Sequence, residues 1–208
     1  MVKVAEENIR TRERILDCAR QIALEVGFAR LSMRAVGRCA GVSAMAIYRH
    51  FADKEALRSA VSDAGFRLFF SYLMRALEED DPWHRFAATG ERYLDFALEH
   101  RGDYILMFLQ NNDPAASAAM PAWRDEATFQ LLKDRLRECM DGGLLRQDDP
   151  ERTALAVWSQ CHGLISLYLT GRLPFSEAQF RQVYAATMGR LITGLKIAGD
   201  SPCRIANT

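Results

Sequence analysis

The sequence predicts an all-α protein of about nine helices, in which an N-terminal three-helix helix-turn-helix domain is joined to a C-terminal helical bundle. Apolar residues recur at helical spacing through most of the chain, and no alternating pattern typical of strands persists. Only six prolines interrupt 208 residues, which leaves room for long helices. A compact helix-turn-helix pattern lies near the N-terminus, between residues 35 and 51. These observations together exclude sheet-based folds.

The first helix is expected to end at Gly27, because glycine is the usual residue just beyond a helix end. Ser32 follows at a position where its hydroxyl can cap a second, short helix. On that helix Val36 and Ala40 lie four residues apart and therefore share one face. Gly41 comes next, where a turn requires a residue that tolerates positive φ.

Ser43 is expected to cap a third helix, which completes the helix-turn-helix. In that helix Ile47 and Phe51 point toward the core. The remaining side chains, Ala44, Met45, Tyr48 and Arg49, point outward, as in a recognition helix that enters the DNA major groove. The alternative interpretation is an ordinary corner between two helices that binds no nucleic acid.

Asp53 can cap a fourth helix that carries Lys54 in its first turn. A positive charge is unfavourable there because of the helix dipole. A docked anion such as a DNA phosphate would account for the lysine, whereas a solvated lysine is the ordinary alternative.

Longer helices are expected in the remainder of the chain. Asp149 followed by Pro150 marks the start of one helix, and Ser176 with Gln179 forms a capping box for another. The predicted ranges are 54–79, 82–100, 103–109, 121–140, 150–170 and 177–198.

The N-terminal region resembles the DNA-binding domain of the TetR family of bacterial transcriptional repressors, over about residues 8–60. A shorter C-terminal match resembles the subgroup with a Trp-x-x-x-His-Gly signature. Two positions depart from the family: Gly37 replaces the usual alanine, and Met45 replaces a small residue. The matching segments are Gly27-Phe28, Ser32-Met33-Arg34, Ala40-Gly41-Val42-Ser43, Ile47-Tyr48-Arg49-His50-Phe51, Lys54-Glu55-Ala56-Leu57, Leu106-Met107-Phe108, and Trp158 with His162-Gly163.

The resemblance implies a DNA-binding domain over 1–53 and a ligand-binding and dimerisation domain over 54–208. It further implies a cytoplasmic bacterial repressor that binds a pseudo-palindromic, double-stranded operator as a homodimer through its last two helices. A small hydrophobic effector, not identified by the sequence, would release it. The residues expected to contact DNA are Ser32, Arg34, Ser43, Ala44, Met45, Tyr48, Arg49, His50 and Lys54.

The charge distribution agrees with this orientation on DNA. The formal net charge is zero, but residues 1–60 hold 11 Lys and Arg against 7 Asp and Glu, a net charge of +4. The rest of the chain carries a net charge of −4. A basic N-terminal part and an acidic remainder would orient the molecule on phosphates.

The sequence contains no pattern of catalytic or metal-binding residues, so we expect no enzyme, cofactor or metal. The four histidines are scattered, and Cys161 and His162 are adjacent on a helix and cannot face one another. Five cysteines lie far apart, and no apolar run is long enough to span a membrane. We therefore expect small, buried, unpaired thiols in a reducing cytoplasm, and no membrane association.

Aromatic and sulfur-containing side chains are abundant between residues 66 and 162 and suggest an effector pocket, because such pockets are mostly apolar. The alternative is that these side chains only form a core. A different function on the same scaffold, a helical carrier or enzyme that does not bind DNA, would not need the cluster of Tyr48, Arg49, His50 and Lys54. The expected ligand-binding residues are Phe70, Tyr93, Met107, Phe108, Trp123, Trp158 and His162.

Overall fold

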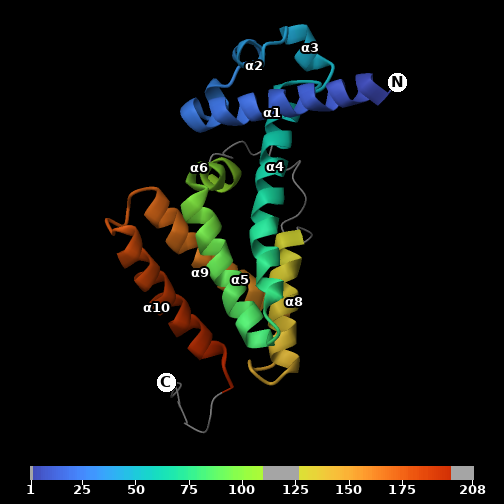
Figure 1. Cartoon of the computed structure of the whole chain (residues 1–208). Helices are drawn as coiled ribbons and strands as arrows, with labels where there is room; N and C mark the ends of the chain where they lie inside the picture. The colour runs from blue at the N-terminus through green and yellow to red at the C-terminus, as the bar shows by residue number, and fades with distance from the viewer. Residues whose placement is uncertain (1, 110–126, 198–208) are drawn as a thin grey trace. The chain divides into compact units, whose positions relative to one another are not determined.

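The computed structural model describes residues 2–109 and 127–197, and all regular structure in these ranges is helical (Figure 1). Nine α-helices, one 3-10 helix and one π-helix occur in the described ranges, in agreement with the predicted fold class. The elements are α1 (Val2–Arg30), α2 (Met33–Ala40), α3 (Ala44–Tyr48), α4 (Lys54–Met74), η1 (Arg75–Glu78), α5 (Pro82–Glu99), α6 (Arg101–Tyr104), η2 (Ile105–Leu109), α8 (Ala127–Asp141), α9 (Pro150–Leu169) and α10 (Glu177–Leu195).

The chain divides into two compact units. The first comprises Met1–Tyr72 with Asp95–Met120, and the second comprises Leu73–Leu94 with Pro121–Thr208. Helices α4 and α5 therefore each contribute residues to both units. The predicted boundary after residue 53 divides the chain by expected function, whereas the two compact units divide it by packing. The boundary therefore stays a prediction.

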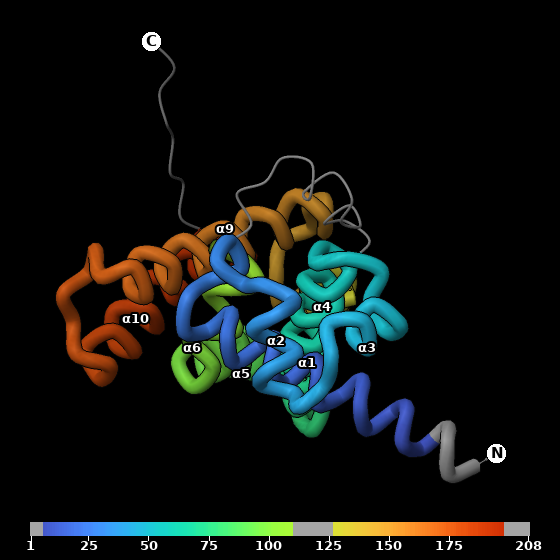
Figure 2. Tube along the Cα trace, turned by 90° about the horizontal axis from the view of Figure 1, so that it is seen from above, coloured from blue at the N-terminus to red at the C-terminus, as the bar shows by residue number. Residues whose placement is uncertain are grey.

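In the first unit, α1 packs against α2, and α2 against α3 (Figures 1 and 2). Ile15 and Ala19 of α1 meet Val36 of α2 and Ile47 of α3 in one core, and all four are completely buried. The helical spacing of these apolar residues places them on facing sides of short helices. Gly27 interrupts α1 with a φ of 78°, as its predicted role at a helix end requires, but helical structure resumes as far as Arg30.

Two glycines allow close helix packing in the same unit. A Cβ atom at Gly102 would collide with Cδ2 of Leu24, so α6 approaches α1 closely there. A Cβ atom at Gly65 would lie 2.7 Å from the sulfur of Met107, so η2 approaches α4. The predicted helix over 103–109 begins two residues earlier and becomes a π-helix at Ile105.

In the second unit, α9 packs against both α8 and α10. The two predicted helix starts are confirmed: Asp149 accepts a hydrogen bond from the backbone of Glu151 at 2.9 Å, and Ser176 forms a capping box with Gln179. Helix α8 is described from Ala127 onward, so the predicted residues 121–126 lie outside the described ranges. The predicted fourth helix changes to 3-10 geometry after Met74.

Candidate nucleic-acid interface and effector region

The turn between α2 and α3 has the geometry of a helix-turn-helix. Gly41 adopts a left-handed conformation, with φ 65° and ψ 32°. Ser43 accepts a hydrogen bond from the backbone N–H of Ala46 at 3.1 Å. A Cβ atom at Gly37 would lie 2.9 Å from the carbonyl oxygen of Val42. The departure from the family's alanine is therefore explained by a close backbone approach at this turn.

Helix α3 separates buried from exposed side chains as the spacing predicts. Ile47 is completely buried, whereas Met45 is 70% exposed and Tyr48 is 48% exposed. Arg49 is also exposed. Packing does not explain why these large side chains of a short, capped helix are exposed to solvent. This face of α3 is therefore a candidate binding surface.

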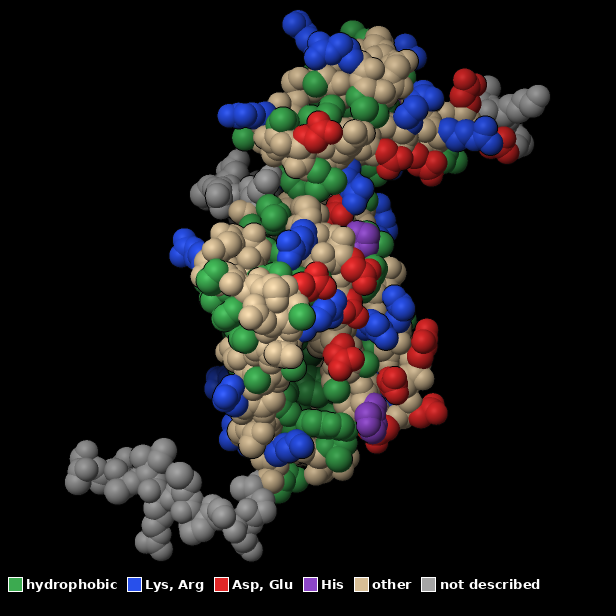
Figure 3. All heavy atoms as spheres, turned by 60° about the vertical axis from the view of Figure 1, so that its left-hand side comes forward, with side chains coloured by type: hydrophobic (Ala, Val, Ile, Leu, Met, Phe, Trp, Pro, Cys, Tyr) green, Lys and Arg blue, Asp and Glu red, His purple; other side chains and the backbone are tan. Residues whose placement is uncertain are grey.

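The remaining predicted DNA contacts lie around the same turn. Ser32 and Arg34 are exposed, while Ala44 and His50 are half-buried. Ser32 caps α2 by accepting a hydrogen bond from the backbone N–H of Ala35 at 3.2 Å. Figure 3 shows Lys and Arg side chains around α1, α2 and α3, in the upper part of the view, together with acidic side chains.

Lys54 has a structural partner that the sequence does not reveal. Its ammonium donates a hydrogen bond to the backbone carbonyl of Ala29 at 3.0 Å, near the end of α1. Asp53 caps α4, as predicted, by accepting from the backbone N–H of Ala56 at 2.7 Å. A lysine at the start of α4 is thus accounted for without an anion, although an ammonium has two further donors.

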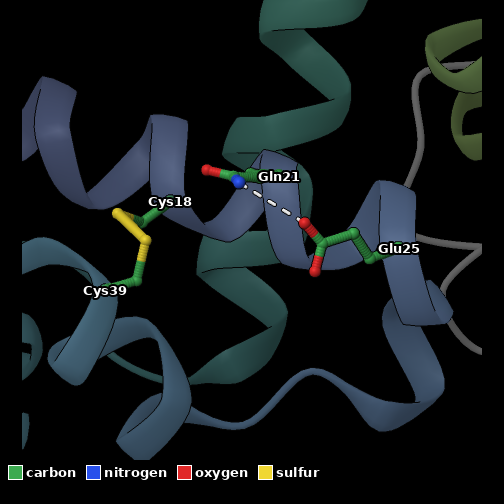
Figure 4. Close-up of a disulfide and its surroundings, with 4 residues drawn as sticks. All are labelled: Cys18, Gln21, Glu25 and Cys39. Carbon is green, nitrogen blue, oxygen red and sulfur yellow. Dashed lines mark hydrogen bonds between the residues drawn. A yellow bond between two sulfur atoms is a disulfide. The ribbon is translucent and has the colours of Figure 1, made fainter.

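The expectation that all five cysteines are unpaired is wrong for two of them. Cys18 of α1 and Cys39 of α2 form a disulfide (Figure 4). They are 21 residues apart, and packing of α1 on α2 brings them together, so local spacing provides no signal. Cys139 and Cys161 are free and buried, as predicted, and burial raises the pKa of each thiol to about 11. Cys203 lies outside the described ranges.

The predicted ligand-binding residues fall into two separate groups. Phe70, Met107 and Phe108 belong to the first unit. There Phe108 packs edge-on against Phe66, with 5.4 Å between ring centroids, and Met107 is buried against Gly65. Trp123 lies outside the described ranges.

The second group is centred on His162 in α9. The hydroxyl of Tyr93, in α5, lies 3.3 Å from Nδ1 of His162. Trp158, one turn earlier, lies 5.6 Å from the His162 ring, and Phe129 of α8 lies 6.2 Å from Trp158. Burial lowers the pKa of His162, so its imidazole is neutral at pH 7. The group is therefore apolar, with a polar pair of side chains within it. Phe129 belongs to the aromatic residues between positions 66 and 162, but it was not among the expected ligand-binding residues.

An ion pair in the first unit was also missed. Arg20 of α1 forms two hydrogen bonds with Asp103 of α6, at 2.6 and 2.5 Å. The hydrogen bond to Asp103 raises the pKa of Arg20, with burial acting in the opposite direction. These residues are 83 positions apart, so no motif in the sequence joins them.

The described ranges contain neither a metal site nor a membrane span. No group of three or more His, Cys, Asp or Glu side chains there could hold a metal ion. No helix in the same ranges is long and apolar enough to cross a membrane.

Comparison with known families covers both halves of the chain. Residues 15–61 match the family described as bacterial regulatory proteins, tetR family. Residues 86–191 match the tetracyclin repressor-like C-terminal domain. The chain belongs to the TetR family.

The curated relatives named here match part of this TetR-family chain. The HTH-type transcriptional regulator UidR of Escherichia coli (strain K12) is 45% identical over 51 residues, which cover 24% of the chain and 26% of UidR. The HTH-type transcriptional repressor Rv1474c of Mycobacterium tuberculosis is 40% identical over 63 residues, which cover 30% of the chain and 34% of that repressor. The chain thus spans about a quarter to a third of these relatives' lengths.

Solved structures match the TetR-family chain over most of its length. A protein with unknown function from Rhodococcus sp. RHA1 is 30% identical, with a TM-score of 0.76, and the match covers 90% of the chain and 96% of that protein. The TetR family transcriptional regulator PfmR from Thermus thermophilus is 24% identical, with a TM-score of 0.66, and the match covers 88% of the chain and 100% of PfmR. The second likeness concerns the fold alone.

Proposed function

We propose that this protein is a cytoplasmic bacterial transcription regulator of the TetR family, which represses by binding DNA through α3 and is released by a small hydrophobic effector. The single observation that carries the DNA-binding part is the face of α3, where Met45 and Tyr48 are exposed while Ile47 is completely buried. The capped turn before α3 supports it, because a recognition helix must be held firmly against its partner helix. On this proposal the protein is not an enzyme.

Within the interface, Met45 and Arg49 would face base edges. Arginine reads guanine through two hydrogen bonds, and an apolar side chain contacts the methyl group of thymine. Tyr48 and Lys54 would contact phosphates, which position the protein without reading sequence. Ser32 and Arg34, at the start of α2, would also face the backbone of the duplex.

The experiment begins with selection of bound sequences from a random duplex library, because the operator is not known. Fluorescence anisotropy across a salt series then measures affinity for a selected duplex. Arg49→Ala should change the preferred sequence, whereas Lys54→Ala should weaken binding to all duplexes and lower the salt slope by about one. Arg172→Ala, a change of an exposed arginine beyond α9, is the matched control and should change neither.

Because Lys54 also bonds Ala29, its removal can weaken binding by loosening the fold. A structural role alone would lower the thermal midpoint and leave the salt slope unchanged. An unchanged slope in Lys54→Ala would therefore remove Lys54 from the interface. Absence of any selected sequence would contradict the DNA-binding proposal as a whole.

A second part of the proposal is that α9 and α10 form a homodimer, which would bind a pseudo-palindromic operator. A single helix-turn-helix contacts few base pairs, and two copies contact two half-sites. A Cβ atom added at Gly163 of α9 or at Gly189 of α10 would meet nothing within 4 Å in the same chain. Leu167 is 40% exposed. These two helices therefore offer open backbone and apolar surface to a second copy.

Two substitutions test this interface. Leu191→Glu would place a charge at the predicted seam of α10 and should give a monomer without operator binding. Gly163→Ala should stabilise an isolated helix by about 1 kcal/mol, but it should weaken a dimer in which the backbone of α9 is closely approached. Light scattering that showed an unchanged dimer for Leu191→Glu would exclude α10 from the interface.

The effector is proposed to bind beside His162. Trp158 lies beside the His162 ring and Phe129 lies beside Trp158, and ligand sites commonly combine apolar walls with few polar groups. The effector would bind a neutral imidazole, which can accept or donate one hydrogen bond.

A thermal-shift screen of apolar small molecules tests this part. His162→Trp should abolish the response to a compound that stabilises the original protein, while operator affinity stays close to normal. Normal response in that variant would show that the effector binds elsewhere. Since ligand coupling is reciprocal, operator DNA should weaken a true effector by the same factor, typically about 5- to 150-fold.

A further inference from the structure

The disulfide in the first unit joins the two helices that precede the recognition helix. Cys18 lies in α1 and Cys39 lies in α2, next to the turn that leads into α3 (Figure 4). Their Cα atoms are 5.8 Å apart, within the usual range of about 5.5–6 Å. The distance between the two helices at this point is therefore ordinary for a disulfide.

Core packing holds the two sulfurs near each other whether or not they are bonded. Ala19 follows Cys18 in α1, and Ala40 follows Cys39 in α2; both alanines are buried in the same core. This core consists of side chains that do not change on reduction. The two thiols of a reduced protein would consequently stay within reach of each other, and proximity favours intramolecular closure over reaction with other thiols.

The two sulfurs also differ from the other described cysteines in access. Cys39 is exposed and Cys18 is half-buried, so small oxidants and reductants can reach the pair. Cys139 and Cys161 are buried, which makes their thiols inert. Among the described cysteines, only Cys18 and Cys39 combine an accessible position with a partner within bonding distance.

We propose that Cys18 and Cys39 form a reversible redox site that locks α1 to α2 on oxidation and keeps the helix-turn-helix in its observed geometry. With hydrogen peroxide, one thiolate attacks an oxygen atom: an S–O bond forms, the O–O bond breaks, and the hydroxide released takes up a proton and leaves as water. The second thiolate then attacks the sulfur of this sulfenic acid: the S–S bond forms, the S–O bond breaks, and the second hydroxide also takes up a proton and leaves as water. Two molecules of a small thiol such as glutathione reduce the disulfide back to two thiols and are oxidised to glutathione disulfide.

Oxidation preserves the recognition geometry rather than disrupting it. The turn at Gly41 and the caps at Ser32 and Ser43 are all present in the disulfide form. The closed loop restricts the unfolded chain. For a separation of 21 residues, this restriction raises the folding equilibrium constant by about 300-fold. Oxidising conditions would therefore stabilise the unit that carries α3. The effect of oxidation on DNA binding rests on the proposed function. The redox site itself does not rest on that function.

The test uses the full chain with Cys203→Ser, so that no thiol outside the described ranges competes. The protein is equilibrated in buffers of reduced and oxidised glutathione or treated with hydrogen peroxide, and free thiols are then blocked and mapped by mass spectrometry. We expect a single internal cross-link between Cys18 and Cys39, reversed by glutathione. The thermal midpoint should rise on oxidation, and Cys39→Ser should abolish both the cross-link and the rise.

Cys39→Ala provides a second variant at the same exposed position, in case serine impairs folding. Intermolecular or mixed disulfides at these cysteines, or an unchanged thermal midpoint on oxidation, would overturn the proposal. Duplex binding by the oxidised protein should be at least as tight as by the reduced protein, and loss of binding on oxidation would overturn the claim that the bond preserves the geometry. Absence of binding in both states, with the cross-link and midpoint shift intact, would contradict only the proposed DNA-binding function.

Discussion

Removal of Arg20 should destabilise the protein more than removal of Asp103, although the two residues form one ion pair. The guanidinium donates two hydrogen bonds to the carboxylate, at 2.6 and 2.5 Å. The two side chains are unequally exposed, at 40% for Arg20 and 6% for Asp103. Without its partner, the carboxyl group would stay buried and lose both hydrogen bonds from Arg20, whereas the guanidinium could return to water.

The magnitude follows from these exposures. Stranding a fully buried charge costs about 3–5 kcal/mol, and an exposed pair contributes about 0–1 kcal/mol. Arg20 is partly solvated, and Nδ1 of His100 lies 3.7 Å from the same carboxylate. We therefore expect Arg20→Ala to lower the free energy of unfolding by about 2 kcal/mol, and Asp103→Ala by about 1 kcal/mol.

Urea denaturation of the full chain, followed by circular dichroism, measures these differences. Arg152→Ala is the control, because that arginine is 88% exposed and pairs with Asp149 at 3.4 Å; its removal should change the free energy of unfolding by less than about 0.5 kcal/mol. The double variant should lose about 1 kcal/mol less than the sum of the single losses. An equal or larger loss in Asp103→Ala, or simple additivity, would refute the argument from the buried carboxylate.

Three further substitutions have defined outcomes. Gly37→Ala should lower the thermal midpoint and weaken duplex binding, because its Cβ would lie 2.9 Å from the Val42 carbonyl oxygen; a higher midpoint would contradict this. Asp149→Ala should lower the free energy of unfolding by about 1 kcal/mol in urea denaturation, because it removes the cap of α9; an unchanged value would contradict this role. Because burial lowers the pKa of His162 below 6.5, the unfolded chain binds more protons below that pH, so stability should fall with decreasing pH. His162→Asn should reduce that fall, and an identical pH profile would contradict the assignment.

Much of the helical structure could be predicted because its signals are local. Ser43 and Asp149 cap helices through backbone groups two or three residues away, and Gly41 provides positive φ within a single turn. The exposed face of α3 also follows from the spacing of its residues around buried Ile47. For the same reason, the helix-turn-helix residues of the candidate interface could be named from sequence.

The effector region was predicted less completely, because an aromatic side chain at helical spacing fits a core as well as a binding site. In the structure, the hydroxyl of Tyr93 lies next to the His162 ring, and the Phe129 ring lies near the Trp158 ring. Phe108 instead packs in the other compact unit, against Phe66. Composition identified the residue types, but it could not assign them to groups.

The sequence by itself determined the helical class, the helix-turn-helix and most helix ends, because caps and turns depend on neighbours within about four residues. Only the tertiary structure decided that Cys18 bonds Cys39 and that Arg20 binds Asp103. It also decided that a Cβ atom at Gly37 would crowd the carbonyl oxygen of Val42. These features arise where separately formed helices pack against each other, and the positions of such contacts depend on the whole core rather than on any local stretch of residues.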